Sequence, residues 1–117
     1  SVISVFYKKK LRNEPFTVVG DGLQTRDFIH VSDVVRAMIK AAQSKVYNQV
    51  FNVGTQKTVN INIIAKLFRG KKKYISERKG EIEHSLANIN KIKKTFRWRP
   101  KISINKGINL LLKKQKF

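Results

Sequence analysis

Two arginines, Arg26 and Arg78, are the side chains whose chemistry is most specific in this sequence. A guanidinium stays charged and can bond two oxygens of one phosphate, which a lysine cannot do in a fixed plane. Two such groups are what a diphosphate needs. Each arginine also has a simpler interpretation. Arg26 could form a salt bridge with Asp27 or Asp33. Arg78 follows a polar stretch and lies beside Lys79, where it could be a solvated charge.

The residues that would make this chain a catalyst by itself are missing. It has no cysteine and two histidines, which excludes disulfides, thiolate metal ligands and a tetrahedral zinc site built from His30 and His84 alone. The six glycines, at 20, 22, 54, 70, 80 and 107, never take the spacing of a dinucleotide-binding fingerprint. The 7 acids indicate no Ser/His/Asp triad and no carboxylate pair. His30, in an apolar stretch, is expected to be a core or interface residue.

Charge is the most unusual feature of the composition: 26 lysines and arginines against 7 acids leave a net charge of +19 on 117 residues. Such a chain attracts anions, and a basic domain can bind nucleic acid by releasing counterions. Aromatic residues do not alternate with the lysine runs as a base-stacking groove requires, so specific nucleic-acid binding is disfavoured. No apolar run is long enough to cross a membrane. The lack of cysteine favours the cytoplasm.

The elements that must position the arginines form one α+β domain over residues 1–117. Apolar periodicity predicts helices near residues 2–11, 33–42, 61–68, 89–96 and 105–112. Short strands are expected at 16–19, 28–31, 50–54 and 74–75. The expected N-caps are Ser32, Asn60, Asn88 and Ser103, and Gly70 is expected to end the third helix. Arg26 then follows a glycine turn at 20–22, and Arg78 lies in a polar loop at 76–80.

Five blocks follow one another along the chain: residues 2–11, 16–33, 51–54 (Phe-Asn-Val-Gly), 78–89 and 98–107. In order and spacing they resemble the carboxyl-terminal half of the extended short-chain dehydrogenase/reductases, the NAD-dependent nucleotide-sugar epimerases and dehydratases. That family uses a tyrosine four residues before a lysine, and Tyr7, Tyr47 and Tyr74 all lack this spacing. The resemblance therefore implies that the catalytic pair and the NAD-binding Rossmann domain belong to an N-terminal half absent from this chain.

The resemblance also implies a substrate-binding lobe that is inactive alone and binds a nucleotide-sugar. Arg26 and Arg78 would converge on the diphosphate, and Glu81 would accept hydrogen bonds from the ribose. The strand that backs the base corresponds to Thr17, Val18 and Val19. The best single match is a UDP-sugar 4-epimerase, with NAD as the cofactor of the full-length enzyme and none bound by this part. A homodimer of the full enzyme is compatible with it.

Some positions depart from the family pattern. Val19 replaces a frequent aromatic residue, which weakens base stacking, and Glu81 stands where aspartate is common. Arg97 replaces a common glycine before Trp98. Two alternative functions stay open: a basic nucleic-acid-binding module, favoured by the charge of +19, and a non-catalytic interaction domain derived from the enzyme lobe.

Overall fold

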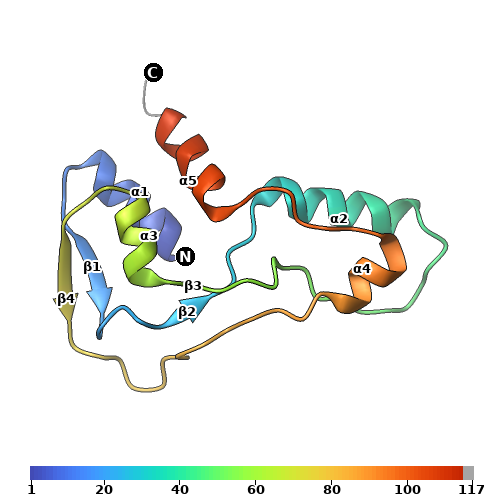
Figure 1. Ribbon diagram of the computed structural model, residues 1–117, viewed down its shortest axis with the longest axis horizontal. Helices are drawn as coiled ribbons and strands as arrows, with labels where there is room; N and C mark the ends of the chain where they lie inside the picture. The colour runs from blue at the N-terminus through green and yellow to red at the C-terminus, as the bar shows by residue number, and fades with distance from the viewer. Residues whose placement is uncertain (115–117) are drawn as a thin grey trace.

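The chain contains both helices and short strands, which confirms the predicted α+β class (Figure 1). The computed structural model describes residues 1–114. In chain order the elements are α1 (Val2–Leu11), β1 (Phe16–Val19), β2 (Thr25–Arg26), α2 (Val31–Gln43), β3 (Val59–Asn60), α3 (Ile61–Leu67), β4 (Lys72–Ile75), α4 (Asn90–Phe96) and α5 (Ile104–Lys113). Across residues 1–114, none of the helices combines the length and the apolar character that spanning a bilayer requires.

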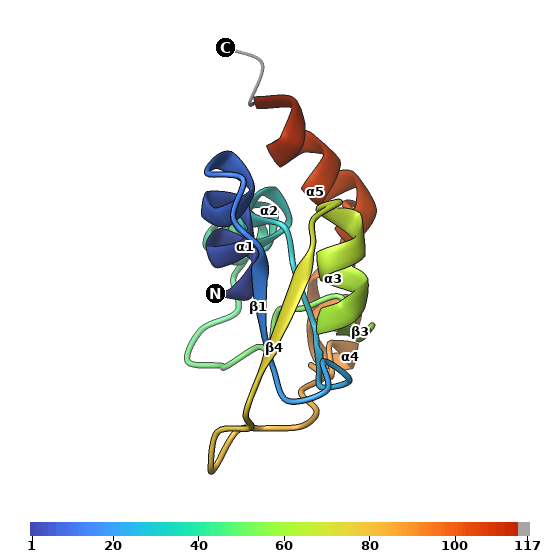
Figure 2. The ribbon, with the colours of Figure 1, turned by 90° about the vertical axis from the view of Figure 1, so that its left-hand side faces the viewer.

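Two short strand pairs organise the half of the molecule that carries Arg26 and Arg78. β1 runs parallel to β4, with Phe16 opposite Lys72, and α1 and α3 flank this pair in the view of Figure 2. Side chains along β1 alternate between buried and half-buried, as a strand with one covered face requires. β2 pairs with β3 in the antiparallel sense, with Thr25 opposite Asn60.

Three phenylalanines from α1, β1 and the end of α3 form the centre of the larger core. The rings of Phe6 and Phe16 stack with centroids 4.7 Å apart, and Phe68 meets both edge-on. Gly70, predicted to end α3, has another role. The helix ends at Leu67, and Arg69 takes the left-handed backbone conformation with φ 55°. A Cβ at Gly70 would collide with the Phe16 ring, so close packing requires the glycine there.

A smaller core joins α2, α4 and the segment after α4. Its buried side chains are Ala37, Ile89, Ile92 and Trp98. Ile89 and Ile92 therefore face inward, while Phe96 is only partly buried against this core. Arg97 adopts φ 49°, the left-handed conformation in which glycine carries no strain, before Trp98 enters the core.

Two predicted strands, 28–31 and 50–54, are not strands. A strand needs a hydrogen-bonded neighbour, and neither segment pairs with another strand within residues 1–114. Instead α2 already begins at Val31, and His30 is its N-cap, with Nδ1 accepting a 3.2 Å hydrogen bond from the Ser32 N–H. The prediction of Ser32 as the N-cap is wrong by two positions, and His30 is a half-buried helix cap.

Of the other three predicted N-caps, two are confirmed and one is not. Asn60 accepts a hydrogen bond from the Ile63 N–H at 2.9 Å, and Ser103 accepts one from the Lys106 N–H at 3.2 Å, so both predictions are confirmed. α4 begins two residues after Asn88, which accepts from the Asn90 N–H but is not the N-cap.

The outer face of α2 carries exposed apolar side chains. Val35, Met38 and Ile39 are 45%, 65% and 49% exposed, although the sequence pattern places them on one apolar face. The molecule is also flat, with extents of 48 × 39 × 18 Å. Its Cα radius of gyration is 16.3 Å, whereas a compact domain of similar length has roughly 13 Å. An extended shape of this kind leaves apolar surface uncovered.

Candidate functional site

A cleft of about 230 Å³ lies where β1 ends, between the turn that follows β1 and the loop that follows β4. The first wall comprises Val19, Gly20, Asp21, Leu23 and Gln24. The second comprises Glu77, Arg78, Glu81, Ile82, Glu83 and His84. Of the predicted site residues, Val19, Arg78 and Glu81 line this cleft. The fold thus brings together residues that are 59 and 62 positions apart in the chain.

The turn after β1 is shaped by two glycines and a set of local hydrogen bonds. Gly20 and Gly22 have φ values of 64° and 76°, a region that side chains with a Cβ rarely adopt. The Asp21 carboxylate accepts from the Leu23 N–H at 2.9 Å, and Gln24 donates to the Val19 carbonyl at 2.9 Å. The first wall of the cleft is therefore a hydrogen-bonded turn.

Carboxylates outnumber cations around the cleft. Asp21, Glu77, Glu81 and Glu83 are four of the 7 acids in the sequence, and all four line it. Arg78 is the one arginine or lysine among the described residues that line it. An anionic group in this cleft would therefore depend on the Arg78 guanidinium. The described residues contain no cluster of three or more metal-binding side chains.

Arg26 lies near the cleft but does not line it. Its guanidinium donates to the Thr25 carbonyl at 2.8 Å and to the Glu83 carbonyl at 3.4 Å, so it contacts the loop that forms the second wall. The alternative of a salt bridge to Asp27 or Asp33 is wrong. Both carboxylates have other partners.

Those partners are structural. Asp27 accepts from the N–H groups of Thr55 and Gln56, at 2.8 and 2.9 Å, and from the Thr55 hydroxyl. It therefore ties the start of the segment after β2 to the glycine-containing segment at 54–56. Asp33 pairs with Arg36 at 2.5 Å.

Thr17 and Val18 do not line the cleft. Val18 is fully buried in the larger core, so its side chain has no free surface for a ligand. The Thr17 hydroxyl accepts a hydrogen bond from the Lys9 ammonium of α1. Only the last residue of β1, Val19, contributes to the wall.

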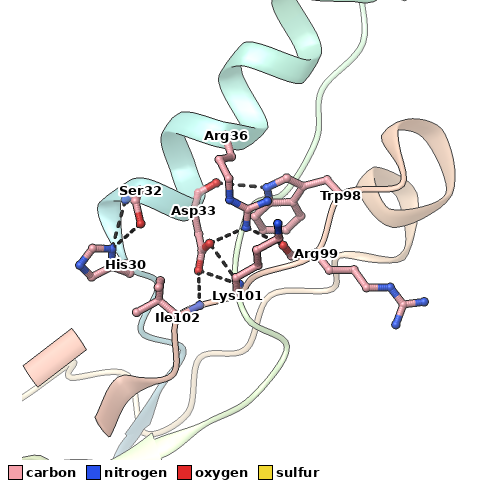
Figure 3. Close-up of polar contacts among 8 residues, drawn as sticks. All are labelled: His30, Ser32, Asp33, Arg36, Trp98, Arg99, Lys101 and Ile102. Atoms are coloured by element: carbon pink, nitrogen blue, oxygen red, sulfur yellow. Dashed lines mark hydrogen bonds and ion pairs between the residues drawn. The ribbon is translucent and has the colours of Figure 1, made fainter. Parts of the chain in front are cut away.

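The Asp33 carboxylate, drawn in Figure 3, accepts several hydrogen bonds and does not line the cleft. It accepts from the backbone N–H groups of Lys101 and Ile102 at 3.0 and 2.9 Å, and from Arg36. Its own carbonyl accepts from the Trp98 indole at 3.1 Å. Burial alone would raise the pKa of this carboxyl, but the hydrogen bonds from Arg36, Ile102 and Lys101 outweigh burial and lower it. The cluster joins α2 to the segment before α5.

Several cleft residues were missed by sequence reasoning, namely Asp21, Leu23, Gln24, Glu77, Ile82, Glu83 and His84. The glycine spacing at 20–22 was a usable signal for the first wall, because a tight turn after a strand exposes its own side chains. No local signal marked His84, which meets Thr25 only after the chain has folded.

The glycine turn after β1 differs from a dinucleotide-binding turn. The turn at Gly20–Gly22 follows a strand, but it leads into β2 instead of a helix N-terminus that could receive a pyrophosphate.

Several known proteins are similar to this chain. The sequence model of the NAD dependent epimerase/dehydratase family matches residues 1–54. A UDP-glucose 4-epimerase from Thermotoga maritima, solved with UDP-glucose, is 34% identical. Its TM-score is 0.89, and the match covers 97% of this chain and 38% of that one. A UDP-glucuronic acid 4-epimerase from Bacillus cereus, solved with UDP-glucuronic acid and NAD, is 25% identical. Its TM-score is also 0.89, and the match covers 100% of this chain and 40% of that one.

The proteins similar to this chain also include a decarboxylase. UDP-glucuronic acid decarboxylase 1 of Xenopus tropicalis is 31% identical over 114 residues, which is 92% of this chain and 27% of that protein. The chain spans less than half the length of each of these relatives. This chain is thus similar over residues 1–54 to the NAD-dependent epimerase/dehydratase family, and over nearly all its length to solved UDP-sugar 4-epimerases.

Proposed function

We propose that this chain is the carboxyl-terminal substrate-binding lobe of a longer NAD-dependent nucleotide-sugar epimerase or dehydratase, most specifically a UDP-sugar 4-epimerase. The observation that carries the proposal is the placement of Arg78 and Glu81 on one loop, facing Val19 across a cleft of about 230 Å³. The relatives solved with UDP-glucose and with UDP-glucuronic acid support a UDP-sugar as the ligand.

Four side chains in the cleft have roles that their chemistry allows. The Arg78 guanidinium bonds diphosphate oxygens, and it offsets the repulsion between the phosphates and the four carboxylates nearby. Glu81 accepts hydrogen bonds from the ribose hydroxyls. Leu23 and Ile82, which are 58% and 63% exposed, offer apolar surface to the flat face of a base.

Arg26 acts differently from Arg78 in this proposal. Its bonds to the Thr25 and Glu83 carbonyls brace the second wall of the cleft, with one guanidinium edge left to reach a phosphate when the cleft closes. In the longer enzyme, NAD supplies hydride transfer from a separate Rossmann domain that also carries the catalytic tyrosine and lysine. This chain alone binds and orients substrate without turning it over.

The test is the substitution Arg78→Ala in the longer enzyme, with Lys79→Ala as the matched control. Lys79 is the adjacent cation of the same loop and does not line the cleft. Loss of a charged hydrogen bond to phosphate should raise the KM for UDP-glucose by about 10-fold or more, because such bonds contribute about 1.5–3 kcal/mol. NAD affinity should stay the same in both variants.

Steady-state kinetics and an NAD titration measure these effects. Unchanged KM and kcat in Arg78→Ala would remove Arg78 from the site. An equal loss in Lys79→Ala would mean that general positive charge, and not a placed guanidinium, attracts the substrate.

A further inference from the structure

The loop that forms the second wall of the cleft, residues 76–85, is attached to the rest of the molecule at its two ends. We call it the cleft loop. At its start, the Gly20 N–H donates to the Ile75 carbonyl at 2.9 Å. At its end, the Thr25 N–H donates to the Glu83 carbonyl at 2.8 Å, and the Ser85 N–H donates to the Thr25 carbonyl at 3.2 Å. Every residue of the loop is solvent-exposed, so these attachments determine its position.

Two side-chain contacts reinforce the second attachment. The Arg26 guanidinium donates to the Glu83 carbonyl at 3.4 Å. The Thr25 hydroxyl lies 2.9 Å from Nδ1 of His84, 59 residues away. The contact survives either protonation state of the imidazole, because a hydroxyl can both donate and accept. It occupies Nδ1 and thereby orients the ring, and His84 lines the cleft.

Thr25 belongs to a well-supported part of the fold. It lies on β2, opposite Asn60 of β3, and the Asn60 side chain caps α3. α3 in turn contributes Ile61, Ile64 and Ala65 to the larger core. The end of the cleft loop is therefore attached, through one strand pair, to a packed helix.

The geometry restricts where the two proposed ligand contacts can move. Arg78 and Glu81 lie between the two attachments, and the 3.3 Å bond from the Glu81 N–H to the Arg78 carbonyl makes a tight turn that contains both. Releasing the attachment at 83–85 would leave an exposed loop held at one end only.

We propose that the Thr25–His84 contact positions the cleft loop, so that Arg78 and Glu81 face the nucleotide diphosphate and ribose. The positioning of the loop stands on the contacts above, and its effect on substrate rests on the function proposed in the previous subsection. Thr25 is the more informative of the two residues because it does not line the cleft. A substitution there removes the contact without removing a wall of the site.

Proteolysis with an endoproteinase that cleaves after glutamate measures the loop directly in this chain. The sequence has four glutamates; Glu77, Glu81 and Glu83 lie in the cleft loop, and Glu14 precedes Pro15, a bond that such enzymes cleave poorly. The initial cleavage rate therefore reports opening of the cleft loop. Thr25→Val, which keeps the shape and removes the hydroxyl, should be cleaved about 3-fold to 10-fold faster, the range for loss of one net hydrogen bond.

The controls separate loop opening from global unfolding. Thr25→Ser keeps the hydroxyl and should be cleaved at the original rate, as should Thr58→Val at an exposed threonine outside the cleft. His84→Ala should match Thr25→Val, and the double variant should be no faster than either, because both remove one contact. Thermal unfolding in the same buffer should be unchanged by these substitutions.

An unchanged cleavage rate in folded Thr25→Val overturns the inference. If Thr25→Val fails to fold, His84→Ala decides in its place, because the exposed imidazole is outside both cores.

Kinetics of the longer enzyme test the functional consequence. Thr25→Val should raise the KM for UDP-glucose several-fold with a smaller change in kcat, and Thr25→Ser should restore it. Faster cleavage with an unchanged KM would overturn the positioning role. An unchanged KM in Arg78→Ala would instead defeat the proposed function, while the cleavage assay would still decide whether Thr25 and His84 hold the loop.

Discussion

Asp33 shows how one buried charge can determine a junction between distant segments. Its carboxylate is fully buried and accepts from Arg36 and from the N–H groups of Lys101 and Ile102 (Figure 3). In the sequence, Asp33 was considered as a salt-bridge partner of Arg26. Its larger role is to satisfy two backbone donors of a proline-containing segment that has no strand or helix partner of its own.

Replacing Asp33 with alanine should therefore destabilise the chain by about 3 kcal/mol, because hydrogen bonds to charged groups contribute about 1.5–3 kcal/mol each and the donors left behind lose their partner. Urea unfolding followed by tryptophan fluorescence measures this through Trp98, which lies in the same cluster. Glu14→Ala, at an exposed acid, is the control and should change the free energy of unfolding by less than about 0.5 kcal/mol. A loss of similar size in both would contradict the special role of Asp33.

The lowered pKa of Asp33 also predicts a pH dependence. Because the folded pKa is below the unfolded value of about 4, the unfolded chain binds this proton more readily. The stability that Asp33 contributes is present above about pH 4 and is lost as the pH falls below it. Thermal unfolding between pH 3 and pH 6 should show this loss in the native chain and less of it in Asp33→Asn. Equal slopes in the two proteins would count against it.

At the scale of the elements, α2 is the helix whose surroundings differ most from those that its pattern predicts. Its apolar residues lie on one face, yet Val35, Met38 and Ile39 are exposed, and the buried positions are Asp33 and Ala37. Amphipathic periodicity locates a helix and its apolar face, but it does not say what covers that face. Under the function proposed above, the remainder of the longer enzyme is available to cover it.

Met38→Gln should consequently leave the free energy of unfolding of this chain within about 0.5 kcal/mol of the original value, since the side chain is already 65% exposed. It should also reduce self-association, measured by light scattering over a range of protein concentrations. Ile92→Ala, in the smaller core, provides the contrast and should cost about 2–5 kcal/mol. A large destabilisation by Met38→Gln would mean that α2 packs its outer face within this chain.

At the scale of the whole molecule, charge is distributed unevenly. Four of the 7 acids line the cleft, and Asp27 and Asp33 are engaged in structural hydrogen bonds. Lysines therefore dominate the remaining surface, including Lys8, Lys9 and Lys10 in the last turn of α1. A flat molecule 18 Å thick with this surface should attract polyanions without distinguishing among them.

Binding to a fluorescent DNA duplex should accordingly fall steeply between two salt concentrations and should not depend on base sequence, because counterion release carries the interaction. Fluorescence anisotropy with two unrelated duplexes measures both properties. Preference for one duplex that persists at the higher salt concentration would instead favour the nucleic-acid-binding alternative.

Local sequence chemistry correctly predicted all five helices of the described residues, with bounds within two residues, and two of their caps. Asn60 and Ser103 could be identified because a cap acts within three residues, and β1 because alternation and a glycine turn are local features. The strands predicted at 28–31 and 50–54 failed because strand formation requires a neighbour that the sequence does not reveal. The same limit applied to Gly70, whose role depends on the Phe16 ring from a distant strand.

For the candidate site, the sequence alone determined the kinds of groups present and carried the resemblance that suggested a nucleotide-sugar. Only the tertiary structure decided which of those groups meet. It placed Val19, Arg78 and Glu81 around one cleft, directed Arg26 to the backbone of the cleft loop and buried Val18. The physical reason is that side-chain chemistry is local, whereas a site depends on contacts such as Thr25 with His84, which form between residues 59 positions apart.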